Sequence, residues 1–183
     1  MTVGSDFELT MDELRVVARY VVEHAEEVLP AFESSVPNDP RPRDAIDAAW
    51  QFVHGAARTR LQRVTAVNAH RAARDAVTEV ARLAARSAGD AASAAYLHPI
   101  SQAGQVGHIL RAAASSARIK ELQAGGDLAV GDREVERSRQ RATPELVDVL
   151  RRYPPAATAK NRTAELMSRL DRSLRQPVDP PAT

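Results

Sequence analysis

The stretch that most constrains this fold runs from Leu61 to Ala88 and contains neither proline nor glycine. Small apolar side chains recur along it in steps of three and four residues, which is the period of an α-helix. We therefore predict one long helix over residues 61–88, with a narrow face of methyl groups that lets a neighbouring helix approach closely. The residues of this inward face are Ala66, Ala69, Ala73, Ala76, Val80 and Leu83.

The composition points to the same fold class. Aromatic residues make up 4% of the chain and hydrophobic residues 44%, so the core has to be built mainly from Ala, Val and Leu. A chain of 183 residues is long enough to bury one sizeable core. We predict an all-α protein, a single-domain bundle of about six to eight helices around the long alanine-rich helix.

Short motifs predict where the first helices begin and end. Thr10 and Glu13 have the spacing of a capping box, so we expect a helix to start there and to end or bend at Pro30. A second helix is expected to begin near the first-turn proline Pro42 and to run to about residue 54. We predict that Trp50 anchors this helix to the long one, because burying an indole contributes roughly 2–3 kcal/mol.

Glycine and proline mark the later boundaries. We expect Gly89 to end the long helix and Asp90 to cap the next one, and we expect the pair Gly125-Gly126 to separate two parts of the bundle. The predicted organisation is an N-terminal tail at 1–9, a helical domain at 10–175 with its core at 10–122 and a C-terminal helical extension at 127–175, and a disordered tail at 176–183.

Charge and motifs exclude several classes of function. The chain has no cysteine and no window apolar enough to span a bilayer, so we expect a cytoplasmic protein with no membrane partner. It contains neither a P-loop nor a dinucleotide-binding glycine motif, and we expect no cofactor. Two short arginine patches, at 58–63 and 137–141, lack interleaved aromatic residues, so we predict no nucleic-acid partner.

A group of polar residues on the predicted helices is the best candidate for chemistry. His70 and Arg74 lie four residues apart and so share a helix face, where Arg74 could pair with a carboxylate of the preceding helix. We interpret the group as a structural polar cluster, since the five histidines lack paired metal-ligand spacing and we predict no metal site. The alternative is a helical-bundle enzyme, or a protein that binds a small molecule or metal, using the same group. Its members are Asp44, Asp47, Trp50, His70, Arg74 and His98.

Three segments of the chain resemble one bacterial family. They are Pro40–Trp50 (PRPRDAIDAAW), Ala69–Arg74 (AHRAAR) and Ala91–His98 (AASAAYLH), with Gly55 after the first. They are similar to the Imm-5-like immunity proteins of polymorphic toxin systems, in which a charged helix with a tryptophan leads into an alanine-rich core helix. The resemblance covers residues 40–100, about a third of the chain.

This resemblance implies stoichiometric binding to a cognate toxin, with no turnover and no catalytic residues. Residues 1–40 carry nine acidic and two basic side chains, so this segment could meet a basic toxin such as a nuclease. The predicted acidic face for that partner consists of Glu23, Glu26, Glu27 and Glu33. The sequence leaves open whether the last two helices belong to the core or swap onto a second copy in a homo-oligomer.

Overall fold

The computed structural model describes residues 7–157 and 160–176 of the chain. Within these ranges it contains eight α-helices, two short 3-10 helices at Ala94–Tyr96 and Ala103–Gln105, and no strand, which confirms the predicted all-α class. The helices are α1 (Met11–Ser35), α2 (Arg41–Val53), α3 (Arg60–Asp75), α4 (Glu79–Ser93), α5 (Val106–Gln123), α6 (Leu128–Arg141), α7 (Pro144–Arg151) and α8 (Arg162–Arg175).

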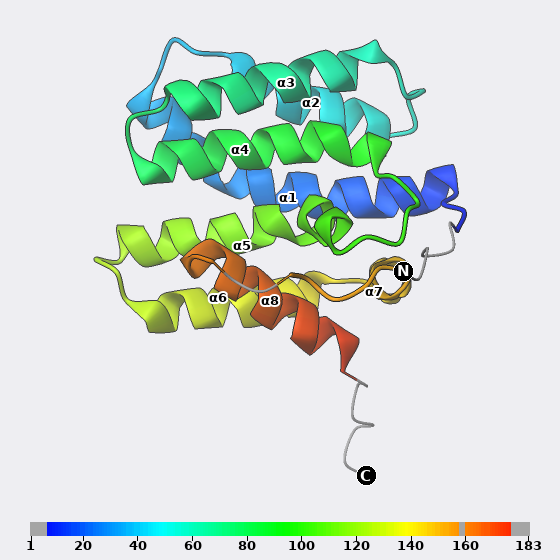
Figure 1. Cartoon of the computed structure of the whole chain (residues 1–183). Helices are drawn as coiled ribbons and strands as arrows, with labels where there is room; N and C mark the ends of the chain where they lie inside the picture. The colour runs from blue at the N-terminus through cyan, green and yellow to red at the C-terminus, as the bar shows by residue number, and fades with distance from the viewer. Residues whose placement is uncertain (1–6, 158–159, 177–183) are drawn as a thin grey trace.

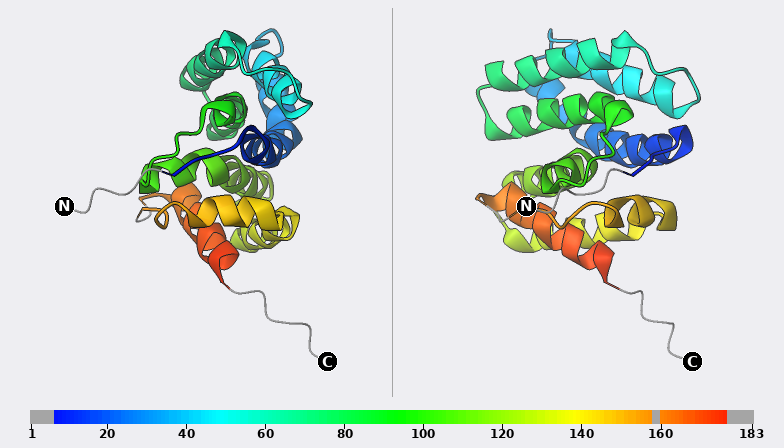
Figure 2. Two further views of the ribbon diagram at one scale, coloured as in Figure 1. Left: turned by 90° about the vertical axis from the view of Figure 1, so that its right-hand side faces the viewer. Right: turned by 45° about the vertical axis from the view of Figure 1, so that its right-hand side comes forward.

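The longer helices lie side by side in layers (Figure 1). Helices α2 and α3 form the outer layer, α1 and α4 lie beneath them, and α5 comes next. The turned views show α1 to α4 as a four-helix group and α5, α6 and α8 as a second group below it (Figure 2). Helix α5 joins the two groups because it packs against α1 and α4 as well as against α6 and α8.

Helix α1 begins where the sequence predicts. Thr10 and Glu13 form a complete capping box: the Thr10 N–H donates to the Glu13 carboxylate (2.9 Å), and the Glu13 N–H donates to the Thr10 hydroxyl (3.1 Å). Pro30 does not end the helix, which continues to Ser35. The extra turn buries Phe32 completely in a cluster with alanines of α3 and α4, and this burial outweighs the backbone hydrogen bond that proline removes.

The prediction of one long helix over residues 61–88 is wrong, because the stretch forms two helices. Helix α3 ends at Asp75, the chain turns back, and α4 begins at Glu79. The N–H of Ala81 donates to the hydroxyl of Thr78 (3.1 Å), so Thr78 caps α4 without help from proline or glycine. A threonine followed by an acidic residue is a helix-start signal, and the continuous helical periodicity concealed it.

The small residues predicted to face a neighbouring helix are buried mainly between α3 and α4. The neighbouring helix is therefore formed by the second half of the same stretch. Helices α3 and α4 pack on each other, and α4 also packs on α1. Helix α4 also runs through Gly89 and Asp90 to Ser93, so these two residues neither end a helix nor cap one. The cluster shared by the three helices includes Val28, Phe32, Ala72, Ala73, Ala76, Ala81, Ala84 and Ala85.

Trp50 lies against α1 and not, as predicted, against the long helix. Its indole N–H donates to the carboxylate of Glu26 on α1 (3.1 Å), and its ring stacks on His54 with 5.2 Å between centroids. The side chain is only partly buried. Helix α2 reaches α3 instead through the buried Gln62, whose amide donates to the carbonyl of Ala48 (3.2 Å).

The turn between α5 and α6 lies at the predicted glycine pair. Gly125 and Gly126 have φ values of +73° and +88°, so the turn between α5 and α6 uses the left-handed conformation that favours glycine. Thr143 caps α7 through the N–H of Leu146 (3.2 Å). Phe7, in the predicted N-terminal tail, packs against Tyr153. Of the predicted C-terminal tail at 176–183, residues 177–183 lie outside the described residues. No helix in the described ranges has the length and hydropathy needed to cross a bilayer.

A buried histidine couples α1 to α6 and makes stability depend on pH. Both ring nitrogens of His24 are within hydrogen-bonding distance of a partner, the Tyr20 carbonyl (2.8 Å) and the Ser138 hydroxyl (3.0 Å). Burial lowers the pKa of His24 from 6.5 to about 4. Between these two values the unfolded chain binds more protons than the folded one, so the contribution of neutral His24 is complete above pH 6.5 and is lost as the pH falls toward 4.

We predict that the free energy of unfolding falls by about 2 kcal/mol between pH 7 and pH 5 because of His24. Urea unfolding at the two pH values measures this change. In a His24→Gln variant, which cannot titrate, the fall should shrink, whereas it should persist in His54→Gln, which removes an exposed histidine. An equal fall in His24→Gln and wild type would contradict the prediction.

Candidate partner-binding surface

The structure does not bring the six residues of the predicted polar cluster together. Asp44 and Asp47 are exposed on α2, and the ion pair that joins α2 to α3 runs from Arg41 to Asp75 (2.9 Å) instead of reaching Arg74. Trp50 faces α1, and His98 is exposed after α4, where its carbonyl accepts the Tyr153 hydroxyl. Of the six, His70 alone belongs to a buried polar group.

That buried group joins α3, α4 and α5 around Asp90. The Asp90 carboxylate is fully buried and accepts two hydrogen bonds from the Arg111 guanidinium, at 2.8 and 2.6 Å. The Nε2 atom of His70 lies 3.8 Å from the same carboxylate. Burial lowers the pKa of His70, and hydrogen bonding to Asp90 raises the pKa of Arg111, so the stable charged pair is Asp90 with Arg111.

The sequence pattern predicted a helix cap at Asp90 and gave no indication of its partner Arg111. An aspartate inside an alanine-rich apolar helix is a signal for a buried ion pair, because a buried carboxylate needs a partner. The signal could be found only with α4 in its correct register. In the described ranges, no group of three or more His, Asp or Glu side chains is arranged to hold a metal ion.

The predicted acidic residues are engaged within the chain. Glu27 pairs with Arg141 of α6 (2.5 Å) and Lys120 of α5 (3.3 Å), and both cations lower its pKa against the opposing effect of burial. Glu23 also reaches Arg141 (3.4 Å). Glu26 accepts the Trp50 indole N–H, and Glu33 pairs with Arg43 (2.8 Å). These contacts reduce the charge that the face can present to a partner, and its role in binding stays a prediction.

The outer side of α3 presents an apolar surface that no other element of residues 7–157 and 160–176 covers. Large aliphatic side chains recur along it with helical spacing, and their exposed fractions are 42% for Leu61 and Val64 and 49% for Val67. Val77, in the turn after α3, is 91% exposed. Single exposed aliphatic residues are ordinary, but a contiguous row on one helix is typical of an interaction site.

Arginines flank this apolar row. Arg60, Arg71 and Arg74 are exposed and, in the part of the chain that the structure describes, form no ion pair with a carboxylate. Arg63 lies over the ring of Tyr96, 4.2 Å from its centroid, which leaves its charge unneutralised. A shallow groove of about 420 Å³ runs between the arginines and the valines. We call this set the α3 surface: Arg60, Leu61, Arg63, Val64, Val67, Arg71, Arg74 and Val77.

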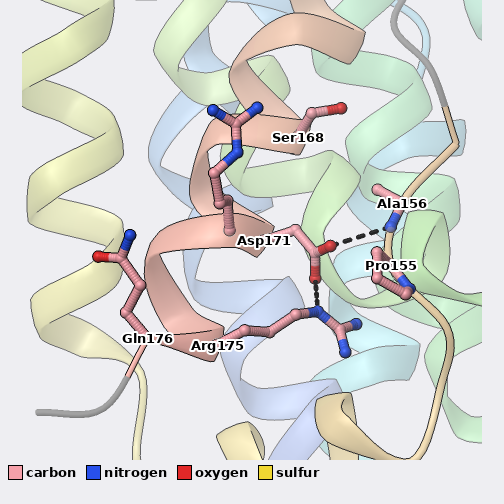
Figure 3. A pocket seen from close by; sticks show the side chains of 7 residues that line it. Pro155, Ala156, Ser168, Asp171, Arg175 and Gln176 are labelled. Atoms are coloured by element: carbon pink, nitrogen blue, oxygen red, sulfur yellow. Dashed lines mark hydrogen bonds and ion pairs between the residues drawn. The ribbon is translucent and has the colours of Figure 1, made fainter.

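A separate pocket of about 530 Å³ lies between α8 and the segment after α7 (Figure 3). Asp171, which is buried, accepts the Ala156 N–H (2.9 Å) and the Arg175 side chain (2.7 Å). Arg175 also donates to the carbonyls of Tyr153 and Leu150 near the end of α7. Because these charged groups satisfy one another, we interpret this pocket as part of the packing of α7 on α8.

The fold defines an all-α helical bundle whose uncovered apolar row lies on one outer helix. A comparison with protein families matches residues 8–144 to a family described as "Imm-5 like putative immunity protein". The match covers well over half of the chain, so the chain belongs to the Imm-5-like family of immunity proteins. This result confirms the family resemblance found in the sequence. No curated protein and no solved structure matches the chain.

The packing of His70 on Gly89 gives a test of the geometry around Asp90. A Cβ atom at position 89 would lie 2.6 to 2.8 Å from three atoms of the His70 ring, so Gly89→Ala has to displace the ring from Asp90. We predict that this clash offsets the gain of about 1 kcal/mol that alanine brings to a helix interior. In a His70→Ala background the gain should appear. Chemical unfolding of the wild type, the two single variants and the double variant measures the coupling, and equal effects of Gly89→Ala in both backgrounds would show that the ring does not pack there.

Proposed function

We propose that this chain is an immunity protein that neutralises a cognate protein toxin by stoichiometric binding in the bacterial cytoplasm. Membership of the Imm-5-like family supports a protein toxin as the partner. The absence of cysteine fits a reducing compartment. In this account the protein blocks the toxin by occupying part of its surface.

The observation that carries the placement of the partner is the α3 surface. The exposed aliphatic side chains of Leu61, Val64 and Val67 supply the apolar centre of an interface, and flanking arginines supply the charged contacts that favour association with an acidic surface. Arginine is enriched at such interfaces because its guanidinium binds carboxylates through two parallel hydrogen bonds. The toxin region that binds here is therefore acidic with an apolar centre.

The acidic residues of α1 offer a second docking surface for a basic toxin, as the sequence predicts. Their ion pairs with α5 and α6 would have to open, or be shared, when such a partner binds. Exposed ion pairs contribute up to about 1 kcal/mol each, so this cost is modest. The two placements require toxins of opposite charge at the contact.

We predict that Val64→Asp combined with Val67→Asp weakens toxin binding by about 100-fold, because it places two charges in the apolar centre of the interface. Titration calorimetry with the toxin that co-purifies with this chain measures the affinity and the one-to-one stoichiometry. Arg71→Glu should weaken binding by about tenfold or more through repulsion of the acidic partner.

The matched control is Arg133→Glu, which reverses an exposed arginine on α6 and should leave the affinity within about twofold. A combined charge reversal at Glu23, Glu26 and Glu27 tests the other face in the same assay. If this reversal abolished binding while the α3 variants bound normally, the placement on α3 would be wrong. If no variant or wild type bound the toxin, stoichiometric neutralisation itself would be wrong.

A further inference from the structure

A second cavity, of about 530 Å³, lies where α4, α5 and the beginning of α8 meet. Its volume falls within the range of roughly 300–1,000 Å³ that is typical of small-molecule sites. Five arginines line it, and Glu79 is the one acidic side chain among its lining residues. The arginines come from three helices: Arg82 and Arg86 from α4, Arg111 and Arg118 from α5, and Arg162 from α8.

Three of these arginines are already neutralised. Arg111 pairs with the buried Asp90 (2.6 Å). Arg118 and Arg162 share the carboxylate of Glu121, which is fully buried, at 3.2 and 2.5 Å. These pairs fix their guanidinium groups in place, so the cavity has a rigid basic wall.

The two arginines from α4 have no carboxylate partner among the described residues. In the described ranges, Arg82 and Arg86 form no ion pair with a carboxylate, although they lie one turn apart on the same face of α4. The cavity therefore holds two positive charges that no carboxylate balances. An anion bound there would be attracted by both guanidinium groups, and no existing ion pair would have to break.

A buried hydroxyl gives a second and independent sign of a ligand. Ser115 lines the cavity, is 0% exposed, and its hydroxyl has no hydrogen-bond partner among the described residues. A buried polar group without a partner costs free energy, and a native structure rarely keeps one without a reason. The hydroxyl has no accessible surface, so a ligand oxygen reaches it only when the side chains around it shift, and accepting from it would then remove the cost.

The beginning of α8 adds donors to the same cavity. Asn161 caps the helix by accepting the N–H of Ala164 (2.9 Å), and the first-turn residues Arg162 and Thr163 also line the cavity. The N–H groups of a first turn have no acceptor within the helix, and the helix dipole favours an anion at this end.

We propose that this cavity binds a small molecule that carries phosphate groups. Guanidinium groups from several helices, a free hydroxyl and a helix N-terminus together match the oxygens of a phosphate better than those of a single carboxylate. The volume accommodates more than one phosphate group. The site is separate from the α3 surface, so the proposal does not rest on toxin binding.

Titration of the full chain with pyrophosphate at low ionic strength tests the site, with inorganic phosphate and citrate as comparison ligands. We expect one pyrophosphate per chain, weaker binding of inorganic phosphate, and little binding of citrate. In Arg82→Gln combined with Arg86→Gln, binding should weaken about 30-fold or more. Both side chains are exposed, so this variant should keep the wild-type melting temperature.

Ser115→Ala separates a ligand role from a packing role. It should weaken pyrophosphate binding about fivefold while raising the melting temperature of the free protein by about 2 °C, because an unpartnered buried hydroxyl is removed. The matched control, Arg133→Gln combined with Arg172→Gln, removes two exposed arginines elsewhere and should bind within about twofold of wild type.

Two results would overturn the proposal. One is the absence of any pyrophosphate binding at concentrations that would reveal a dissociation constant of about 1 mM. The other is equal weakening in the two double-arginine variants, which would show that the anion responds to overall charge and not to this cavity.

Discussion

Ion pairs between α1 and the helices of the C-terminal half determine where charge remains on the surface of this protein. Residues 1–40 hold nine acidic and two basic side chains, while the whole chain has a net charge of +1. Glu23 and Glu27 of α1 are balanced by Arg141 of α6 and Lys120 of α5. Because these two carboxylates pair with α5 and α6, they do not neutralise the arginines on the outer faces of α3 and α4, which have no carboxylate partner among the described residues.

The α3–α4 hairpin therefore carries two basic surfaces of different shape. On α3 the arginines flank a row of exposed aliphatic side chains, an arrangement suited to another protein. On α4 they line a cavity with a buried hydroxyl, an arrangement suited to a small anion. Close packing of alanines between the two helices holds both surfaces on one rigid unit, so neither requires a mobile loop.

Local signals in the sequence predicted much of the fold, but they could not predict which helices meet. The capping box at Thr10 and the glycine turn before α6 depend on neighbours in the chain, and both are confirmed. The turn at Thr78 was missed because helical periodicity continues across it. Asp90 pairs with Arg111, which is 21 residues away in the chain and lies on the neighbouring helix. The α3 surface can be recognised only from the structure, which shows that the described helices leave these side chains exposed. Such features depend on tertiary packing, which local patterns do not specify.

We propose that the partner binds on α3, where positive charge and apolar side chains are exposed together. A methyl NMR spectrum of the chain, titrated with the cognate toxin, tests this most directly because valine and leucine methyl groups lie on both candidate faces. We predict shifts at Leu61, Val64 and Val67. Shifts confined to Val16 and Leu146, which line the pocket beside Glu23, would contradict the account and place the toxin on the acidic face.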